Sequence, residues 1–238
     1  MNIYENPHVE AAYLKRVAEY LGGPRDDTKI HLSDLQGCPL PAFYRLTTPV
    51  ELQPGDDRSS ILRFFRGRCV ERAIATEMEP KEKDRIICTA DDMHPDHGLG
   101  EIKSTMEGCE FWIPEREHPE WVERMKGYAH IYGETKVNLI VYFMGGNVMN
   151  YTPWSIKQNG RVQGKYRGVE FKVWTLEFTP EELDENWAVM LERRDVLELA
   201  ITHGVPPEPD YVAGLVKPWH CKLCRWRDSC YYVNEGET

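Results

Sequence analysis

The fold is decided by residues Thr89–Thr105, which read TADDMHPDHGLGEIKST. Strand-forming runs at 86–89 and 99–104 flank a segment rich in turn-forming residues, and this pattern predicts a β-hairpin whose turn is centred on Asp96. In an antiparallel hairpin with that centre, Asp91 is expected to lie opposite Glu101.

Two carboxylates in this position repel each other unless a cation lies between them or one of them is protonated. Mg²⁺ or Mn²⁺ is the natural partner, because hard cations prefer oxygen ligands and complete their shell with water and substrate phosphate. Lys103 points to the same face as Glu101, where its ammonium can stabilise charge on a phosphoryl group. Asp91, Glu101 and Lys103 thus predict a hydrolytic site. A register shifted by one residue would put Asp92 in place of Asp91. The alternative to a hydrolytic site is a solvated hairpin with ordinary surface charges.

Composition narrows the class of protein. The 238 residues include 29 Lys and Arg against 39 Asp and Glu, for a net charge of −10, so any contact with DNA must be local rather than through bulk basicity. A content of 41% hydrophobic and 29% charged residues excludes disordered and low-complexity chains. We expect a cytoplasmic protein, because no apolar run approaches the roughly 18–20 residues of a membrane span and the first residues do not resemble a secretory signal.

Periodicity and capping residues predict the remaining elements. The start of the last helix has a capping-box pattern, with Thr179 as the cap and Glu182 reaching back to it. Helices are expected at 8–21, 59–78, 121–132 and 179–202, a short helix carrying Cys38 after Ser33, the first hairpin strand at 86–89, and further strands at 137–144, 148–154 and 169–178.

Glu71 is unusual because, at helical spacing, it shares a face with apolar residues. A partly buried salt bridge with an arginine and a role as a ligand are equal alternatives on this observation alone.

The segment around Asp91, with the Glu101-Ile102-Lys103 step ten residues later, resembles the core of the PD-(D/E)XK nuclease superfamily. Two further matches extend the resemblance. Gly67-x-x-x-Glu71 stands where RecB-like members carry a glycine followed by a metal-contacting residue, and Arg124-x-x-x-Tyr128 resembles their Gln-x-x-x-Tyr helix, with arginine in place of glutamine. The resemblance implies an α/β fold with a mixed central sheet flanked by helices. It assigns Glu71, Asp91 and Glu101 to the metal, and it assigns Lys103, Arg124 and Tyr128 to catalysis beside those carboxylates.

Three of the seven cysteines form a C-x₂-C-x₅-C array at Cys221, Cys224 and Cys230, a spacing typical of a metal centre that needs a fourth ligand. Cys38 resembles the N-terminal cysteine of iron-sulfur RecB-like exonucleases such as the CRISPR-associated Cas-four family. The resemblance implies a [4Fe-4S] cluster on these four cysteines. Zinc, with Cys₄ or Cys₃His ligands including His220, is the alternative, because spacing does not distinguish the two. The other three cysteines are expected to be small buried hydrophobes: Cys69, Cys88 and Cys109.

The resemblance implies a metal-dependent DNA exonuclease that prefers single-stranded DNA or duplex ends, in recombination, repair or CRISPR adaptation with partner proteins. We expect one nuclease domain over 1–238, made of a helical segment 1–58 with the first cluster cysteine, a core at 59–204 and a cluster-binding tail at 205–238. A basic loop offers four candidate DNA contacts, for each of which a solvated side chain is the alternative: Arg161, Lys165, Tyr166 and Arg167. A catalytically silent DNA-binding scaffold stabilised by the cluster or by zinc is the alternative function, which the presence of Asp91, Glu101 and Lys103 together disfavours.

Overall fold

The structure is a computed structural model that describes residues 7–21, 28–49, 58–76, 78–107, 109, 112–144, 169–208, 221 and 224–230. The chain divides into two compact units. One unit consists of Val70–Lys81 and Cys88–Trp187, and the other of Met1–Cys69, Glu82–Ile87 and Ala188–Thr238. All the residues predicted for the hydrolytic site belong to the first of these, which we call the sheet unit; we call the other the terminal unit.

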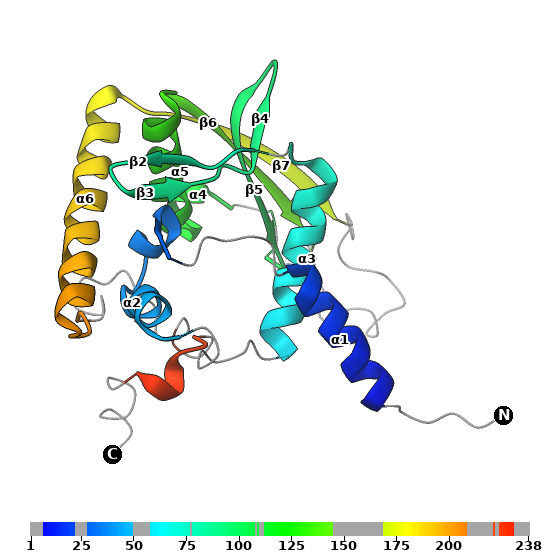
Figure 1. The fold of residues 1–238 in the computed structure, drawn as a ribbon. Coiled ribbons are helices and arrows are strands. Elements are labelled where there is room, and N and C mark those ends of the chain that lie inside the picture. Colours follow the sequence, from blue (N-terminus) through cyan, green and yellow to red (C-terminus); the bar gives the residue numbers. More distant parts are fainter. Residues whose placement is uncertain are drawn as a thin grey trace, which may run out of the picture. The chain divides into compact units, whose positions relative to one another are not determined.

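The sheet unit is built on four strands in the order β4-β5-β6-β7. β5 and β6 run parallel, whereas the β4–β5 and β6–β7 pairs are antiparallel, so the sheet is mixed. Two helices, α4 and α5, provide the crossover that a parallel pair requires between β5 and β6 (Figure 1). The bounds are β4 Asp92–His94, β5 Gly98–Thr105, α4 Pro114–Glu117, α5 Pro119–Tyr132, β6 Lys136–Phe143 and β7 Glu170–Glu177.

The core of this unit lies on one face of β6. Val137, Leu139, Val141 and Phe143 alternate along the strand and are completely buried, as expected for residues of one face. In the parallel register Glu101 pairs with Leu139 and Lys103 with Val141, so β5 presents its two charged residues to the same face. α5 packs against β6 and buries Val122, Met125 and Ala129. Thus α5 covers the side of the sheet on which Glu101 and Lys103 lie.

The hairpin has the predicted register. Asp92 pairs with Gly100, Met93 with Leu99 and His94 with Gly98, and continuing this pairing by one residue places Asp91 opposite Glu101. Position 100 is tightly packed, because a Cβ there would approach the Asp92 Cβ to 3.3 Å and the Ile140 Cδ1 to 3.2 Å, so a larger residue would displace these neighbours.

The first hairpin strand was wrongly predicted at 86–89. β3, Ile86–Cys88, pairs in parallel with β1, Ile30–His31, in a separate three-stranded sheet of order β1-β3-β2, and β4 takes its place in the hairpin. The reason is that the apolar run Ile86–Cys88 ends before the bend at Asp91, and the short polar strand after the bend pairs with β5 instead.

The terminal unit contains the remaining short elements. Its bounds include α1 Pro7–Leu21, a 3-10 helix η1 Leu32–Leu35, α2 Leu40–Thr47 and a 3-10 helix η4 Arg227–Ser229. Cys38 lies between η1 and α2 rather than within a helix, because α2 begins only at Leu40, after the N-cap Pro39. Four elements contribute residues to both units: β2 Lys81–Lys83, β3, α3 Arg58–Ile74 and α6 Pro180–His203.

The long helices follow their predicted boundaries closely. At the start of α6 the Thr179 amide donates to Glu182 Oε2 at 2.8 Å and the Glu182 amide donates to Thr179 Oγ1 at 3.2 Å, which confirms the capping box. α3 ends at Ile74, four residues before the predicted end. The predicted strand at 148–154 lies outside the described residues. Within the part of the chain that the structure describes, no helix has both the length and the apolar character needed to span a membrane.

Candidate active site

Asp91 and Asp92 have different environments, although they are adjacent. Asp91 Oδ2 accepts a hydrogen bond from the Ile102 amide at 2.8 Å and lies 3.6 Å from Lys103 Nζ. Asp92 Oδ1 instead accepts from the Thr76 amide at 2.9 Å and from the Thr76 hydroxyl at 2.6 Å. The structure therefore brings Asp91 to the lysine, whereas Asp92 ties the segment after α3 to the hairpin.

Glu101 is the most deeply buried charged residue of the site. Its side chain is 1% exposed. Burial and the charge of Asp91 raise the pKa of Glu101, Lys103 and Arg124 act in the opposite direction, and the result is a pKa raised from 4.5 to about 7. Because a buried charge is costly, the ionised carboxylate depends on cations beside it.

Lys103 connects the two carboxylates. Its ammonium forms ion pairs with Glu101 Oε1 and Asp91 Oδ2, and it also donates to the Ile102 carbonyl at 3.1 Å. The side chain is 20% exposed, so its charged end lies at the boundary between the buried carboxylate and solvent.

α5 adds two residues to this cluster. Arg124 Nη1 lies 3.7 Å from Glu101 Oε1. Burial lowers the pKa of Arg124, but Tyr128, Glu101, Asp91 and Glu120 raise it by more, so the guanidinium stays charged. Burial, together with the charge of Glu101, raises the pKa of Tyr128 well above its usual value, so its hydroxyl keeps its proton and can donate a hydrogen bond.

The cluster fits a divalent cation. Asp91 and Glu101 supply carboxylate oxygens, and magnesium sites commonly use one or two protein carboxylates together with substrate phosphate. Glu71 lies half-buried on α3, and it does not form a three-ligand cluster with them. Among the described residues, no group of three or more histidine, cysteine, aspartate or glutamate side chains is arranged to hold a metal ion.

The four predicted cluster cysteines lie in the terminal unit, and all four are partly exposed and free of disulfides. Burial raises the pKa of Tyr44, and the charges of Cys230 and Cys38 raise it further. Burial also raises the pKa of Cys224, with contributions from Cys221 and Cys230. The early and late cysteines therefore share one neighbourhood. The described residues still include no set of three close enough to ligate one metal, so this geometry does not itself form a cluster site.

The terminal unit holds this neighbourhood together through aromatic and polar contacts. Tyr44 stacks on Trp226 with ring centroids 5.4 Å apart, and its hydroxyl donates to the Ser229 carbonyl at 3.2 Å. Cys88 and Cys109 are buried as predicted, but Cys69 is exposed on α3, so its interpretation as a buried hydrophobe was wrong. The four candidate DNA contacts at 161 and 165–167 lie outside the described residues.

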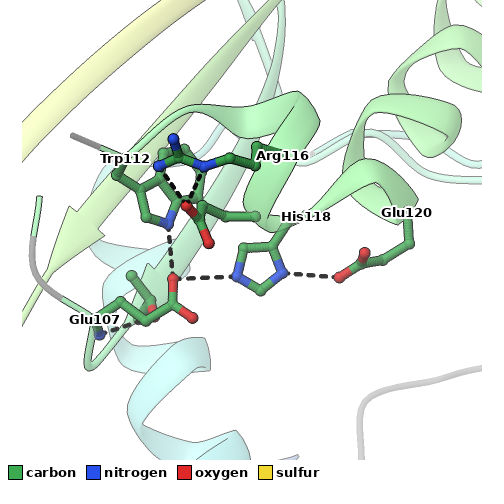
Figure 2. A network of polar contacts seen from close by, with 7 residues as sticks. Glu107, Trp112, Arg116, His118 and Glu120 are labelled. Atoms are coloured by element: carbon green, nitrogen blue, oxygen red, sulfur yellow. Dashed lines mark hydrogen bonds and ion pairs between the residues drawn. The ribbon is translucent and has the colours of Figure 1, made fainter. Parts of the chain in front are cut away.

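A polar network around His118 was not predicted from the sequence. His118, at the start of α5, lies between two carboxylates, with Nδ1 2.8 Å from Glu120 Oε1 and Nε2 3.3 Å from Glu107 Oε2 (Figure 2). The Trp112 indole donates to the same Glu107 oxygen at 2.7 Å. The charged and aromatic residues that form this network follow no periodic pattern in the sequence, so nothing indicated that they would meet.

Comparisons with known proteins concern the fold. No protein family model matches the chain, and no curated protein matches its sequence. The chain is similar to the solved structure of SSO0001, with a TM-score of 0.52 and 12% identity over 94% of this chain and 96% of that one. At this identity the similarity shows a shared fold, and the predicted α/β class with a mixed sheet flanked by helices is confirmed.

Two exonuclease structures match less well. LHK-Exo, an alkaline exonuclease from Laribacter hongkongensis solved in complex with dAMP, has a TM-score of 0.47 and 15% identity over 86% of this chain and 98% of that one. A phage-related exonuclease from Haemophilus somnus has a TM-score of 0.42 and 11% identity over 74% of this chain and 96% of that one.

Proposed function

We propose that this chain is a Mg²⁺- or Mn²⁺-dependent deoxyribonuclease that hydrolyses phosphodiester bonds as an exonuclease on single-stranded DNA or duplex ends. The observation that carries the proposal is the pairing of Asp91 Oδ2 and Glu101 Oε1 with one ammonium, that of Lys103, while the Glu101 side chain is almost completely buried. Two carboxylates that converge on one lysine at the boundary with solvent can bind a divalent cation and a phosphate, and an isolated structural ion pair has no such use.

Asp91 and Glu101 are the proposed metal ligands. When bound, the ion would neutralise charge on the scissile phosphate and lower the pKa of a bound water. The Ile102 amide fixes the orientation of Asp91, and the surrounding core fixes that of Glu101, so neither ligand must be ordered when a metal binds.

The remaining site residues supply positive charge and a proton donor. Lys103 can orient the attacking water or stabilise negative charge that develops on the phosphoryl oxygens. Arg124 offers a charged fork suited to phosphate, and the protonated Tyr128 hydroxyl can donate a hydrogen bond to a phosphate oxygen.

Glu71 is proposed as a further metal ligand, and the basic loop residues as contacts to DNA. We also propose that Cys38, Cys221, Cys224 and Cys230 hold a [4Fe-4S] cluster whose role is structural, since hydrolysis needs no electron. The shared neighbourhood of the early and late cysteines around Tyr44 supports this. Recombination, repair and CRISPR adaptation, with DNA and the proteins of those processes as partners, are the proposed settings.

The test compares Asp91→Asn, Glu101→Gln and Lys103→Ala with the wild type on end-labelled linear and circular single-stranded DNA in Mg²⁺ or Mn²⁺. Each variant should lose cleavage of linear DNA and keep its circular dichroism spectrum, while circular DNA stays intact with the wild type. Asp96→Asn, in the exposed hairpin turn, is the control that should cleave normally. Cleavage by the Glu101 variant at the wild-type rate would overturn the proposal.

A further inference from the structure

The His118 network connects two segments next to the proposed site. Glu107 follows β5 and lies four residues beyond Lys103, whereas Glu120 lies in the first turn of α5, one helical turn before Arg124. The His118 imidazole bridges these two segments through both ring nitrogens (Figure 2). It therefore links the strand that carries Glu101 to the helix that carries Arg124.

Aromatic packing fixes the plane of the imidazole. His118 stacks on Trp121 with ring centroids 3.8 Å apart and planes 6° apart, and Trp112 approaches it to 5.8 Å. Only 15% of the His118 side chain is exposed. With the ring plane set by Trp121, the directions of its two nitrogens are also set.

The charges around His118 favour its protonated form. Burial lowers the pKa of His118, but the hydrogen bond and charge of Glu120, followed by those of Glu107, raise it by more. In the same segment Arg116 pairs with Glu117, at 2.6 Å between Nη2 and the carboxylate. A protonated imidazole donates from both nitrogens, so it can hold Glu107 and Glu120 at the same time.

Glu120 connects this network to the proposed site. It lies four residues before Arg124, an arrangement in which a glutamate and a following arginine are neighbours on the helix surface. The charge of Glu120 acts in the same direction as that of Glu101 on the pKa of Arg124. Glu101 contacts the same guanidinium at 3.7 Å. Arg124 thus has one carboxylate buried in the core beside it and a second, held by His118, one helical turn before it on α5.

We propose that His118 is a positioning residue, which fixes Glu120 through its Nδ1 hydrogen bond and so fixes the Arg124 guanidinium beside Glu101. The inference rests on the proposed function in one respect, the role of Arg124 toward phosphate. The hydrogen bonds of His118 go to Glu107 and Glu120 and not to Asp91, Glu101 or Lys103, so it acts through Glu120.

The first experiment follows the ring resonances of His118 and the Arg124 Nε–H resonance by NMR in metal-free protein. Glu120→Gln should lower the pKa of His118 and shift the Arg124 resonance. Glu107→Gln, the matched control, should lower the pKa of His118 but leave the Arg124 resonance in place. An Arg124 resonance that is unchanged in Glu120→Gln would overturn the proposal whether or not the protein cleaves DNA.

The second experiment compares two isosteric replacements. In His118→Asn the amide nitrogen occupies roughly the place of Nδ1 and can still donate to Glu120, whereas in His118→Gln it occupies roughly the place of Nε2 and can donate only to Glu107. Both variants lose the stacked ring and differ from each other by one methylene group. We expect His118→Gln to lose about tenfold in kcat and to shift the Arg124 resonance, and His118→Asn to stay within about threefold of the wild type.

Equal losses in the two variants would show that His118 matters only for packing and would overturn the positioning role. If the wild type cleaves no DNA, the proposed function fails. The selective shift of Arg124 in His118→Gln would then still support positioning, and its absence would overturn it.

Discussion

Replacing Glu101 with glutamine should stabilise the metal-free protein above neutral pH while it abolishes cleavage. Burial, with the charge of the nearby Asp91, raises the pKa of this carboxylate from 4.5 to about 7 despite the opposing charges of Lys103 and Arg124. Glutamine keeps the shape of the side chain and removes the ionisation. Ionisation of the Glu101 carboxylate therefore lowers the free energy of unfolding of the metal-free wild type.

The sign and the size follow from linkage. Because the folded pKa lies above the ordinary value, the stabilising contribution of Glu101 is fully present below about pH 4.5 and is lost as the pH rises through about 7. At 1.36 kcal/mol per pKa unit, the complete loss is about 3 kcal/mol. The side chain is 1% exposed, so solvent screening does not reduce this figure much. A cation held by Asp91 and Glu101 would restore the loss by stabilising the ionised form.

The measurement is urea unfolding in EDTA at about pH 5 and about pH 8. The free energy of unfolding of Glu101→Gln, relative to the wild type, should rise by up to about 3 kcal/mol over this range, because only the wild type titrates. Added Mn²⁺ should stabilise the wild type at about pH 8 and leave the variant unchanged. Asp96→Asn serves as the control for a carboxylate in the exposed turn. Parallel pH profiles of the wild type and Glu101→Gln would refute the reasoning.

Three further predictions concern other residues. Glu71→Gln should weaken Mn²⁺ binding in titration calorimetry if Glu71 is a ligand, and unchanged affinity would favour a salt bridge. Anaerobically purified protein should be brown, and alanine at any of the four cluster cysteines should bleach it and lower its Tm, whereas Cys88→Ala should keep the colour; stoichiometric zinc without iron would contradict the cluster. Thr76→Val should lower the free energy of unfolding in urea by about 1.5–3 kcal/mol, because it removes a hydroxyl donor from Asp92. The cleavage rate per folded molecule should stay unchanged, and a lower rate would indicate that Asp92 takes part in catalysis.

The hairpin could be predicted because its information is local. The turn-forming residues around Asp96 fix the register, and the register fixes which carboxylate faces Glu101. The burial of Glu101 could not be predicted, because it depends on β6 and α5, which pair and pack with β5 only in three dimensions. The pairing of Ile86–Cys88 was wrong for the same reason, since its partner strand lies more than fifty residues earlier in the chain.

The discontinuity of the terminal unit has a consequence for biosynthesis. The sheet unit is complete once Trp187 has been made, whereas the terminal unit needs residues from both ends of the chain, as the Arg193 hydrogen bond to the Leu35 carbonyl illustrates. Domains generally fold as units during translation, so we expect the sheet unit to fold first on the ribosome. Met1–Cys69 then remains without its packing partners until Ala188–Thr238 has been synthesised. Proteolysis of stalled nascent chains, with protection appearing first between Cys88 and Trp187, would reveal this order.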